Sequence, residues 1–415
     1  MGALSVARMR EGALAGVRVL DLTSVIMGPY ATQLLADLGA EVISIETVQG
    51  GENRRMGGGN HPEFSGISLN LLRNKQSVAL DLKDPAARDA LLALAANCDI
   101  FVTNLRPKPI ERLGLTYESI RAIRPDVIYC RAQGFAGDHP RADDPAYDDI
   151  IQAESGLADA NHQTSGTPQI APTILADKVC GMAIAQAITA ALFYRNRTGE
   201  GQHVEVPMMD VMRAFMLVEH GDAAITDDAA PAGYRRVLNA ERGPQRTADG
   251  WINILPYSGP AFDALFGENG RADMVGDPRS RGSQIIPNAR DLYAELRPII
   301  ATRTTAEWLA FCSAHSIPVG RIATLDELVA ELPLAGHPDV GDYRLIPQPV
   351  RYSATPVSAP TPARRIGEDT RAALLAAGVV PAAVEDLFAR GVAVDPAHSA
   401  ATPTRQGGQH VDPVR

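Results

Sequence analysis

Apolar residues follow the spacing of strands and helices through most of the N-terminal half of the chain. Residues 17–22 are rich in branched apolar side chains and predict a β-strand. Gly28-Pro29 then predicts a helix start, because proline suits the first helical position. Gly39 ends this helix, and residues 41–46 predict a second strand. A strand, a helix and a strand within about thirty residues indicate a right-handed parallel unit.

This alternation of strand and helix continues downstream. Further strands are expected at 77–82, 100–102 and 127–131, with helices at 85–96 and 117–123. Residues 197–206 predict a turn followed by another strand. Strands that alternate with helices favour an α/β fold with a doubly wound, Rossmann-like parallel sheet. Ligands of such sheets bind beyond the carboxyl ends of the strands. The sequence therefore predicts a binding site at the loops that follow these strands.

The second half of the chain has a different order of elements. A stretch rich in Ala, Asp and Pro resembles a linker, and a strand followed by three helices predicts a smaller α+β domain. The predicted organisation is an N-terminal arm (1–15), a large α/β domain (16–220), a linker (221–245), a small domain (246–325), a return segment that completes the large domain (326–390) and a disordered tail (391–415).

Composition narrows the possible functions. A formal net charge of −10 over 415 residues argues against a nucleic-acid partner. The 4 cysteines are scattered and form no Cys-x-x-Cys pair, so neither a metal site nor a disulfide framework is indicated. No apolar run of membrane-spanning length and no signal peptide are recognised, which predicts a cytoplasmic protein without a membrane partner.

An NAD-dependent enzyme is the first alternative to consider. Glu46, at the end of the second predicted strand, stands where such enzymes hold a ribose hydroxyl. The turn after the first strand, residues 23–29, contains only Gly28, whereas the pyrophosphate approach requires glycines at three positions. NAD is therefore not expected as a cofactor.

Asp177 is the most informative single residue. It lies between an apolar run and a helix of small residues, from 178 to about 194. From position alone, N-capping of that helix explains this aspartate. A carboxylate at a helix start also meets unpaired N–H groups and the positive end of the helix dipole. Cys180 is close by, but no histidine or asparagine pairs with it as a nucleophile would require.

Taken together, many short segments resemble the class III (CaiB/BaiF-type) CoA-transferase family. The resemblance covers about residues 14–380 and lies in ordered segments: 16–22 with Gly28-Pro29, 35–43, 73–82, 103–107, 112–115, 147–148, 152–156, the Asp177 helix, 198–202, 248–251 and 367–370. Each segment is weak alone. Their number and order identify the family, but not the acyl donor or the acid acceptor.

The resemblance implies a function and a set of site residues. Family members transfer CoA from an acyl-CoA thioester to a carboxylic acid, through an aspartyl mixed anhydride and an aspartyl-CoA thioester. The catalytic aspartate falls on Asp177, and Asp148 is expected to orient it. The family also forms interlocked homodimers. Expected CoA contacts fall on Val25, Ile26, Arg73, Asn74, Lys75, Asn104, Leu105 and Arg112.

Some positions depart from the family pattern. Ile26 stands where some transferases carry glutamine, Thr47 where they carry arginine, and Pro145 where they carry a basic residue. Arg54 and Arg55 are both candidates to replace the missing arginine. Formyl-CoA transferases of the family carry a glycine-rich lid in the second domain, but no such run is found between residues 243 and 259. Oxalate and formate are therefore not expected as substrates, and a larger acyl group or acceptor is expected instead.

Two other functions remain open within the family. An α-methylacyl-CoA racemase needs two bases, one of them a histidine paired with the aspartate, but the histidine position is occupied by Tyr147. His139 and His162 are near in sequence but out of register. A catalytically silent CoA-binding relative is the second alternative.

Overall fold

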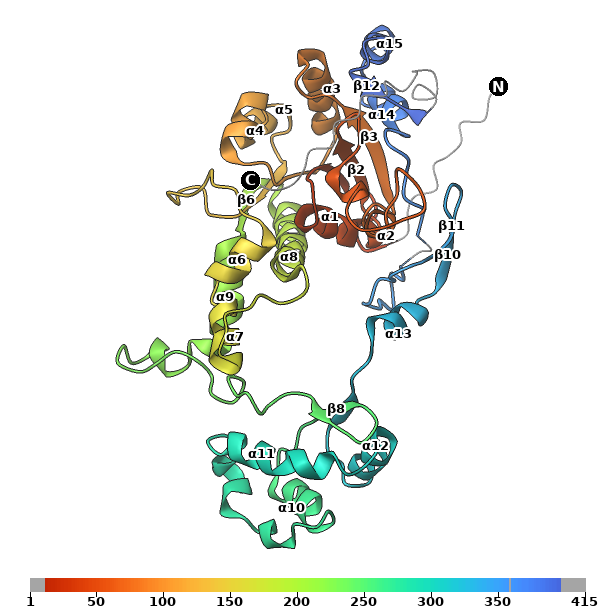
Figure 1. The fold of residues 1–415 in the computed structure, drawn as a ribbon. Helices are drawn as coiled ribbons and strands as arrows, with labels where there is room; N and C mark the ends of the chain where they lie inside the picture. The colour runs from red at the N-terminus through yellow and green to blue at the C-terminus, as the bar shows by residue number, and fades with distance from the viewer. Residues whose placement is uncertain (1–11, 358–359, 397–415) are drawn as a thin grey trace, which may run out of the picture. The chain divides into compact units, whose positions relative to one another are not determined.

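The computed structural model describes residues 12–357 and 360–396, which form two compact units (Figure 1). Unit 1 contains the described residues within 1–148, 174–211 and 333–415, and unit 2 contains 149–173 and 212–332. The expected domain boundaries at 220 and 245 therefore differ from the packing, which places 149–173 and 212–245 in unit 2.

Unit 1 is built on a seven-stranded sheet of order β12-β3-β2-β1-β4-β5-β6. Its strands are β1 (Arg18–Leu22), β2 (Glu41–Glu46), β3 (Lys75–Leu80), β4 (Ile100–Thr103), β5 (Ile128–Gln133), β6 (Gln202–Pro207) and β12 (Ala393–Val394). All neighbours are parallel except β12, which pairs antiparallel with β3. The expected doubly wound sheet is confirmed. Its order reverses between β1 and β4, where such sheets bind ligands.

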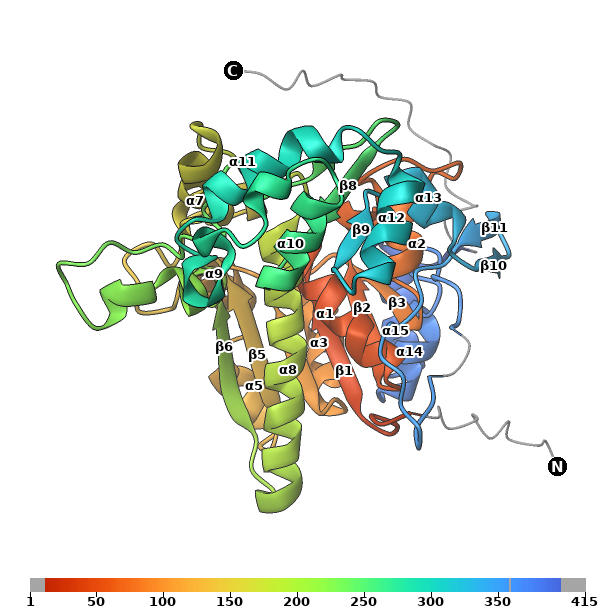
Figure 2. The ribbon, with the colours of Figure 1, turned by 90° about the horizontal axis from the view of Figure 1, so that it is seen from below.

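Helices cover both faces of this sheet (Figure 2). They are α1 (Met27–Asp37), α2 (Gly66–Leu71), α3 (Pro85–Ala96), α4 (Pro107–Leu113), α5 (Tyr117–Ile123), α8 (Leu175–Thr198), α14 (Thr370–Ala376) and α15 (Pro381–Ala389). Leu20 and Leu22 pack with Leu91 and Leu374 in the core under α3, α5, α14 and α15. Because side chains alternate along a strand, Asp21 points to the opposite face, where α1 packs against α8.

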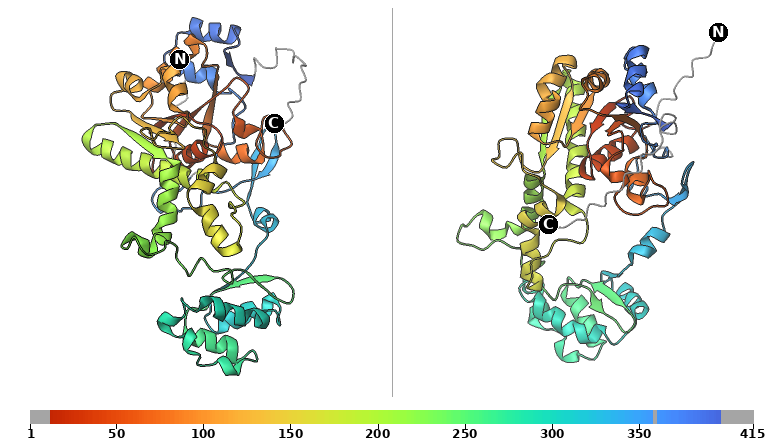
Figure 3. Two further views of the ribbon diagram at one scale, coloured as in Figure 1. Left: turned by 60° about the vertical axis from the view of Figure 1, so that its left-hand side comes forward. Right: turned by 45° about the horizontal axis from the view of Figure 1, so that its top comes forward.

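Unit 2 contains a small antiparallel sheet and the helices around it, coloured green to teal in Figure 3. Its strands are β7 (Gln245–Arg246), β8 (Trp251–Ile254) and β9 (Val319–Arg321), and its helices include α10 (Gly259–Gly267), α11 (Ala289–Ile300), α12 (Thr305–Ala314) and α13 (Leu325–Ala330). Trp308 is fully buried in their core, and its indole N–H donates to the carbonyl of Ile300 at 2.8 Å. The smaller α+β part is confirmed.

The helices α6 (Asp148–Glu154) and α9 (Met208–His220) each cross a boundary between the units along the chain, and α7 (Leu157–Ser165) belongs to unit 2. Residues 345–356 follow the hairpin of β10 (Leu334–His337) and β11 (Gly341–Arg344). By length and composition alone α8 could cross a membrane, contrary to the expectation that no such run exists. The core helix of a soluble protein passes the same test.

The expected tail beginning at residue 391 needs correction. Ala393 and Val394 form β12, and the carbonyl of Val392 accepts a hydrogen bond from Asp81 N–H at 2.8 Å. Three apolar residues are too few to show a period, so no periodic pattern predicts this strand. Residues 397–415 lie outside the described part of the chain.

Candidate active site

Asp177 lies inside the first turn of α8 and does not cap it. The helix begins at Leu175, its N-cap is Ile174, and no side chain caps it. The interpretation of Asp177 as an N-cap is therefore wrong. Its side chain is 7% exposed, and the backbone N–H of Met27 in α1 donates to its carboxylate. The carboxylate is thus held between the starts of two helices.

The surroundings of Asp177 make its carboxylate unusually basic. Burial and the nearby negative charge of Asp148 raise the pKa of Asp177 to about 6, against the opposing effect of the Met27 N–H. At neutral pH the group is still mostly ionised, but it is poorly hydrated. A poorly hydrated carboxylate is a better nucleophile than one in water.

Asp148 holds the backbone of Asp177 in place. Its Oδ1 accepts a hydrogen bond from the Asp177 N–H at 3.0 Å, and the residue is 8% exposed at the start of α6. The contact expected between the two acids is present, and it runs through the backbone of Asp177. Asp148 is thus placed to orient Asp177 and to raise its pKa.

Gly181 allows α8 to approach α1 closely. A Cβ at this position would lie 2.8 Å from the carbonyl oxygen of Met27 and 2.9 Å from a ring carbon of Tyr30. Real Cβ atoms essentially never approach backbone so closely. The glycine therefore keeps the Met27 amide within reach of Asp177, one turn earlier in α8.

The loop after β1 is clamped at the point where the sheet order reverses. Asn104, the residue after β4, accepts a hydrogen bond from Ser24 N–H at 3.1 Å and donates one to the Ser24 carbonyl at 2.9 Å. The next residue, Val25, has φ of +65°. A β-branched residue in this left-handed region is strained, which marks the loop as a candidate functional element.

A cavity of about 880 Å³ opens beyond the carboxyl ends of β1, β2 and β3. Of the expected contact residues, Leu105 and Arg112 line it. Ser24 also lines it, beside the expected contacts Val25 and Ile26, which do not. The cations along its wall are Arg55, Lys83, Arg88 and Arg112, and apolar positions include Leu80, Leu82 and Leu105. The cavity can thus hold an anionic group and a flat apolar one.

A short stretch of backbone connects this cavity to Asp177. Ser24 lines the cavity, and Met27 donates to the Asp177 carboxylate. Three residues span at most about 11 Å when fully extended. The clamped loop therefore keeps Ser24, in the wall of the cavity, within the length of a small flexible ligand arm of the residue that binds the carboxylate.

The expectation that Arg73, Asn74 and Lys75 face a ligand is corrected by their surroundings. Arg73 is 4% exposed and binds both carboxylate oxygens of Asp37, at 3.2 and 2.6 Å. The Asn74 amide bonds to Asp37 and to the backbone of residue 361. These residues precede or begin β3, at the edge of the sheet opposite to the cavity.

Lys75 is likewise a structural residue. Its Nζ lies 3.2 Å from Asp21 Oδ2 and donates to the Pro29 carbonyl at 2.8 Å and to Thr32 Oγ1 at 2.7 Å. Its side chain is 1% exposed, and burial lowers its pKa despite the charge of Asp21. This ammonium stabilises the packing of α1 on the sheet and has no donor left for a phosphate.

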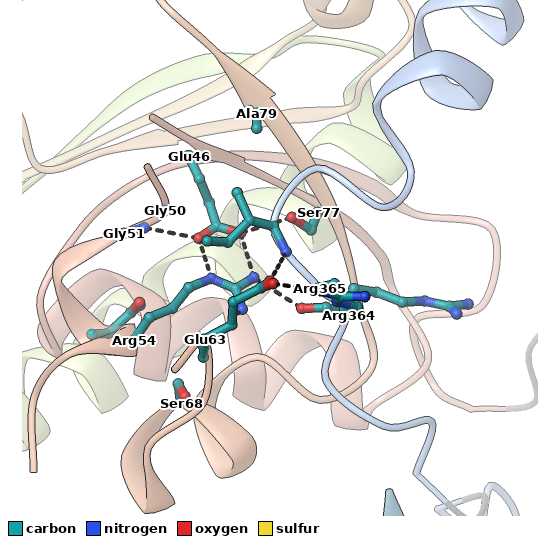
Figure 4. A network of polar contacts seen from close by, with 12 residues as sticks. Glu46, Gly50, Gly51, Arg54, Glu63, Ser68, Ser77, Ala79, Arg364 and Arg365 are labelled. Atoms are coloured by element: carbon teal, nitrogen blue, oxygen red, sulfur yellow. Dashed lines mark hydrogen bonds and ion pairs between the residues drawn. The ribbon is translucent and has the colours of Figure 1, made fainter. Parts of the chain in front are cut away.

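The two candidates for the missing arginine after β2 have different roles. Figure 4 shows the Arg54 guanidinium between β2 and the C-terminal segment, where it donates to both Glu46 oxygens at 2.6 Å and to the Arg364 carbonyl at 2.9 Å. The side chain is 2% exposed and cannot reach a ligand. Arg55 is exposed and lines the cavity, so Arg55 is the available replacement.

Glu46 belongs to the same buried network. It accepts further hydrogen bonds from Gly51 N–H at 2.9 Å and Ser77 Oγ at 2.7 Å. Although burial acts to raise its pKa, these donors and Arg54 lower it. With both oxygens bound internally, the carboxylate has no place for a ribose hydroxyl.

Sequence reasoning missed Lys83 and Arg88. Lys83 is exposed, comes just after β3 and lines the cavity, and Arg88 lies in the first turns of α3. The signal was available, because the rule that ligands bind beyond strand carboxyl ends points to residues after β3. The family resemblance pointed to Arg73 and Lys75 instead, at the start of the strand.

The alternative nucleophile and bases are poorly placed. Cys180 is fully buried, and burial with the charge of Asp177 raises its pKa to about 12, so its thiol stays protonated. Tyr147 is 64% exposed, and His139 stacks on Phe135 with ring centroids 5.1 Å apart. Within the described residues, no group of three or more His, Cys, Asp or Glu could hold a metal.

Comparisons with known proteins identify the family of this chain. The family model described as CoA-transferase family III matches residues 14–370. A probable fatty acyl-CoA transferase of Mycobacterium tuberculosis is 32% identical over 378 residues, which cover 86% of this chain and 95% of that protein. The mouse succinyl-CoA:glutarate CoA-transferase is 31% identical over 372 residues, 86% of this chain and 85% of that protein.

Solved structures give the same result. A crystal structure of the M. tuberculosis protein superposes with a TM-score of 0.73 at 30% identity, covering 87% of this chain and 99% of that one. A CaiB/BaiF family protein from Brucella suis gives a TM-score of 0.76 at 25% identity, covering 89% and 100%. The expected family and class of enzyme are confirmed: the chain belongs to CoA-transferase family III.

Proposed function

We propose that this protein transfers CoA from an acyl-CoA thioester to a carboxylic acid, with Asp177 as the nucleophile. The observation that carries the proposal is the buried Asp177 carboxylate, whose pKa is raised to about 6 and which is held by the Met27 N–H. The clamped loop that positions Met27 also lines a cavity with four cationic side chains. Relatives named as a probable fatty acyl-CoA transferase and as a succinyl-CoA:glutarate CoA-transferase support the same assignment.

The cavity in unit 1 is the proposed site for the nucleotide end of CoA. Lys83, Arg88 and Arg112 are placed to pair with phosphates, and Arg55 supplies the charge that Thr47 lacks. Leu80, Leu82 and Leu105 offer apolar surface for a flat base. The pantetheine arm would then extend past Ser24 toward Asp177. No metal or nicotinamide cofactor takes part in this proposal.

The first half of the reaction forms an enzyme-bound thioester. An Asp177 oxygen attacks the thioester carbonyl carbon, the C–S bond breaks, and CoA leaves as the thiolate with a mixed anhydride on Asp177. The thiolate then attacks the aspartyl carbonyl, which releases the donor acid as a carboxylate and leaves Asp177 bound to CoA through sulfur. Backbone N–H groups near the start of α8 and α1 are available to stabilise the oxyanions.

The second half reverses these steps with the acceptor. The acceptor carboxylate attacks the aspartyl carbonyl, the thiolate leaves, and the new anhydride joins acceptor and Asp177. The thiolate attacks the acceptor carbonyl, which gives the new acyl-CoA and frees the Asp177 carboxylate. Bonds formed and broken balance without an external oxidant, reductant or base. Covalent catalysis thus divides one difficult exchange into simpler ones.

The active protein is proposed to be a homodimer. In α8, Met182, Phe193 and Tyr194 are 50%, 65% and 42% exposed, and Val218 in α9 is 85% exposed. Exposed apolar side chains of this kind mark surfaces that associate. Light scattering after gel filtration should give the mass of two chains at low micromolar concentration. A monomer that retains full activity would contradict this proposal.

A cytoplasmic location is also proposed. All 4 cysteines are free and buried, which suits a reducing compartment. Fractionation of cells, with antibody detection, should find the protein with soluble cytoplasmic markers. Its recovery in a membrane or secreted fraction would contradict the location.

The transfer itself is tested by trapping the covalent intermediate. The protein is incubated with acetyl-, succinyl- and 2-methylacyl-CoA, treated with hydroxylamine, and analysed by intact and peptide mass. We expect an adduct on Asp177 that is absent in Asp177→Asn and present in Asp149→Asn, a matched exposed neighbour. No adduct, together with α-proton exchange on the branched acyl-CoA, would assign the racemase. CoA binding without either reaction would assign a silent binder.

A further inference from the structure

The turn between β3 and α3 leads to two of the cations that line the cavity in unit 1, Lys83 and Arg88. Local hydrogen bonds hold its backbone. Asp81 accepts one from the Lys83 N–H at 3.1 Å through its side chain and one from the Asp84 N–H at 3.0 Å through its carbonyl. Arg88 Nη1 donates to the carbonyls of Leu82 and Lys83, each at 3.2 Å. The shape of this turn therefore sets where both cations stand in the cavity wall.

The C-terminal strand β12 supports the same turn from another part of the chain. The Asp81 N–H donates to the carbonyl of Val392 at 2.8 Å, and Ala393 pairs with Leu80, the last residue of β3. Leu80 and Asp81 both line the cavity. In Figure 1, α14 and β12, coloured blue, lie beside α3 and β3. The segment that the sequence placed in a disordered tail thus backs one wall of the cavity.

Arg390, at the end of α15, links this segment to α3. Its guanidinium donates to both oxygens of Asp84, at 2.7 and 3.3 Å, and to Asp386 at 2.8 Å. Asp84 is the N-cap of α3 and accepts a hydrogen bond from the Ala86 N–H at 2.8 Å. The hydrogen bond from Arg390 is the largest cause that holds the pKa of Asp84 below its usual range. One side chain thus joins α15 to the start of the helix that carries Arg88.

Gly391 turns the chain from α15 into β12. Its φ is +67°, in the left-handed region that glycine adopts without strain. Its N–H donates to the Phe388 carbonyl at 3.0 Å, and the N–H of Val392 donates to the Leu387 carbonyl at 2.9 Å. A Cβ at Gly391 would meet no atom within 4 Å. A side chain here would therefore strain the backbone of the turn without a clash.

We propose that Arg390, Gly391 and β12 position the turn between β3 and α3 so that Lys83 and Arg88 can bind the phosphates of CoA. The inference rests on the proposed function in taking the cavity as the site of the nucleotide end. Arg390 and Gly391 are positioning residues that act through the two cations. Hydrogen bonds between cations and phosphates depend on distance and angle, so a shifted turn weakens them. The effect falls on the affinity for CoA and leaves the reacting groups unchanged.

Calorimetric titration of the full-length protein with CoA compares two glycines of similar conformation. Gly391→Ala and Gly378→Ala both place alanine at a positive φ, +67° and +88°, with no atom within 4 Å of the new Cβ. Gly378 lies between α14 and α15 and does not line the cavity. Both variants should lose similar stability in urea. We expect the Kd for CoA to rise about tenfold in Gly391→Ala only, which corresponds to one charge-assisted hydrogen bond. The same CoA affinity in both variants would overturn the proposal.

Variants of the ion pair separate position from charge. Asp84→Asn removes a negative charge next to Lys83 and keeps an N-cap for α3. Electrostatic attraction alone would make this variant bind CoA more tightly. Because its bond from Arg390 is weaker, we expect binding about threefold weaker instead. Tighter binding of CoA by Asp84→Asn would refute the positioning role.

The arginine itself is tested in the same titration. Arg390→Gln should weaken CoA binding about fivefold, and Arg390→Lys should restore most of the affinity because it keeps the charge that faces Asp84. Arg321→Gln breaks the ion pair of a similarly exposed arginine in unit 2 and is the matched control. A loss of CoA affinity in Arg321→Gln equal to that in Arg390→Gln would show that the effect is not specific to this turn.

A truncated donor separates this inference from the proposed function. With acetyl-CoA, the KM of Gly391→Ala should rise about tenfold with little change in kcat. Acetyl-pantetheine lacks the nucleotide and its phosphates, so it should react equally with wild type and variant. No adduct on Asp177 in wild type, with weaker CoA binding in Gly391→Ala, would reject the transfer and keep the positioning role. Normal adducts with an unchanged KM for acetyl-CoA would reject the positioning role alone.

Discussion

The side chain of Asn104 binds both backbone groups of Ser24. Its Oδ1 accepts a hydrogen bond from the Ser24 N–H at 3.1 Å, and its Nδ2 donates one to the Ser24 carbonyl at 2.9 Å. The two residues follow β4 and β1, the strands between which the sheet order reverses. This contact therefore fixes the loop that separates the cavity from Asp177. An amide can make it because it carries both a donor and an acceptor.

Replacement of Asn104 should lower activity because it shifts the loop after β1, without removing a group that reacts. Asn104→Asp keeps the acceptor for Ser24 N–H but loses the donor, and Asn104→Leu loses both. A shift of about 1 Å near a reacting group can cost about 100-fold in rate. We expect kcat/KM to fall about tenfold for Asp and about 100-fold for Leu, measured by acyl-CoA formation. Asn196→Asp, at an exposed position of α8, is the control. Equal activity in all three variants would show that the clamp has no part in catalysis.

Val25 should report the strain stored in the same loop. Its φ of +65° is accessible to glycine without penalty, whereas a β-branched residue pays about 1–2 kcal/mol. Val25→Gly should therefore raise the free energy of unfolding by up to about 1 kcal/mol, because the greater entropy of the unfolded chain offsets part of the gain. Activity should fall as the loop loosens. Chemical denaturation and kinetics measure the two effects, and a less stable Val25→Gly protein would contradict the strain.

The pKa of Asp177 predicts a pH dependence with a definite sign. Only the ionised carboxylate attacks, so the rate of adduct formation should fall about tenfold per pH unit below about 6 and level off above it. Rapid-quench measurement of the adduct between pH 4.5 and 8 gives this profile. If the rate of adduct formation fell only below about pH 4, Asp177 would be as well solvated as an ordinary aspartate.

The same pKa shift should be visible in stability. A carboxyl whose folded pKa lies above its unfolded value favours folding at low pH and loses that contribution as pH rises from about 4 to about 6. Above pH 6, the rise in the pKa of Asp177 from 3.8 to about 6 lowers the free energy of unfolding of the wild type by up to about 3 kcal/mol. Asp177→Asn should therefore be more stable than wild type at pH 8, with the difference shrinking at pH 5. A difference that does not change with pH would disprove the coupling.

Features set by neighbouring residues could be predicted from the sequence, whereas features set by contacts between distant residues could not. Strand period and the position of Leu105 and Arg112 after β4 are local, and both residues line the cavity at the carboxyl edge of the sheet, as expected from these signals. Which arginine faces a ligand is decided by carboxylates far along the chain. Arg73 meets Asp37, 36 residues away, and Arg54 also reaches the carbonyl of Arg364, so neither outcome could be read from spacing.

The contrast between Lys75 and Lys83 gives the sharpest test of the revised site. Lys75→Met leaves the buried Asp21 carboxylate without its cation, which should destabilise the protein by about 3–5 kcal/mol. The KM of the folded fraction for acyl-CoA should not change. Lys83→Met removes an exposed cation of the cavity, so stability should stay within about 0.5 kcal/mol while that KM rises about tenfold. Urea denaturation and steady-state kinetics on both variants decide the matter. A raised KM with unchanged stability in Lys75→Met would return the phosphate contact to the start of β3.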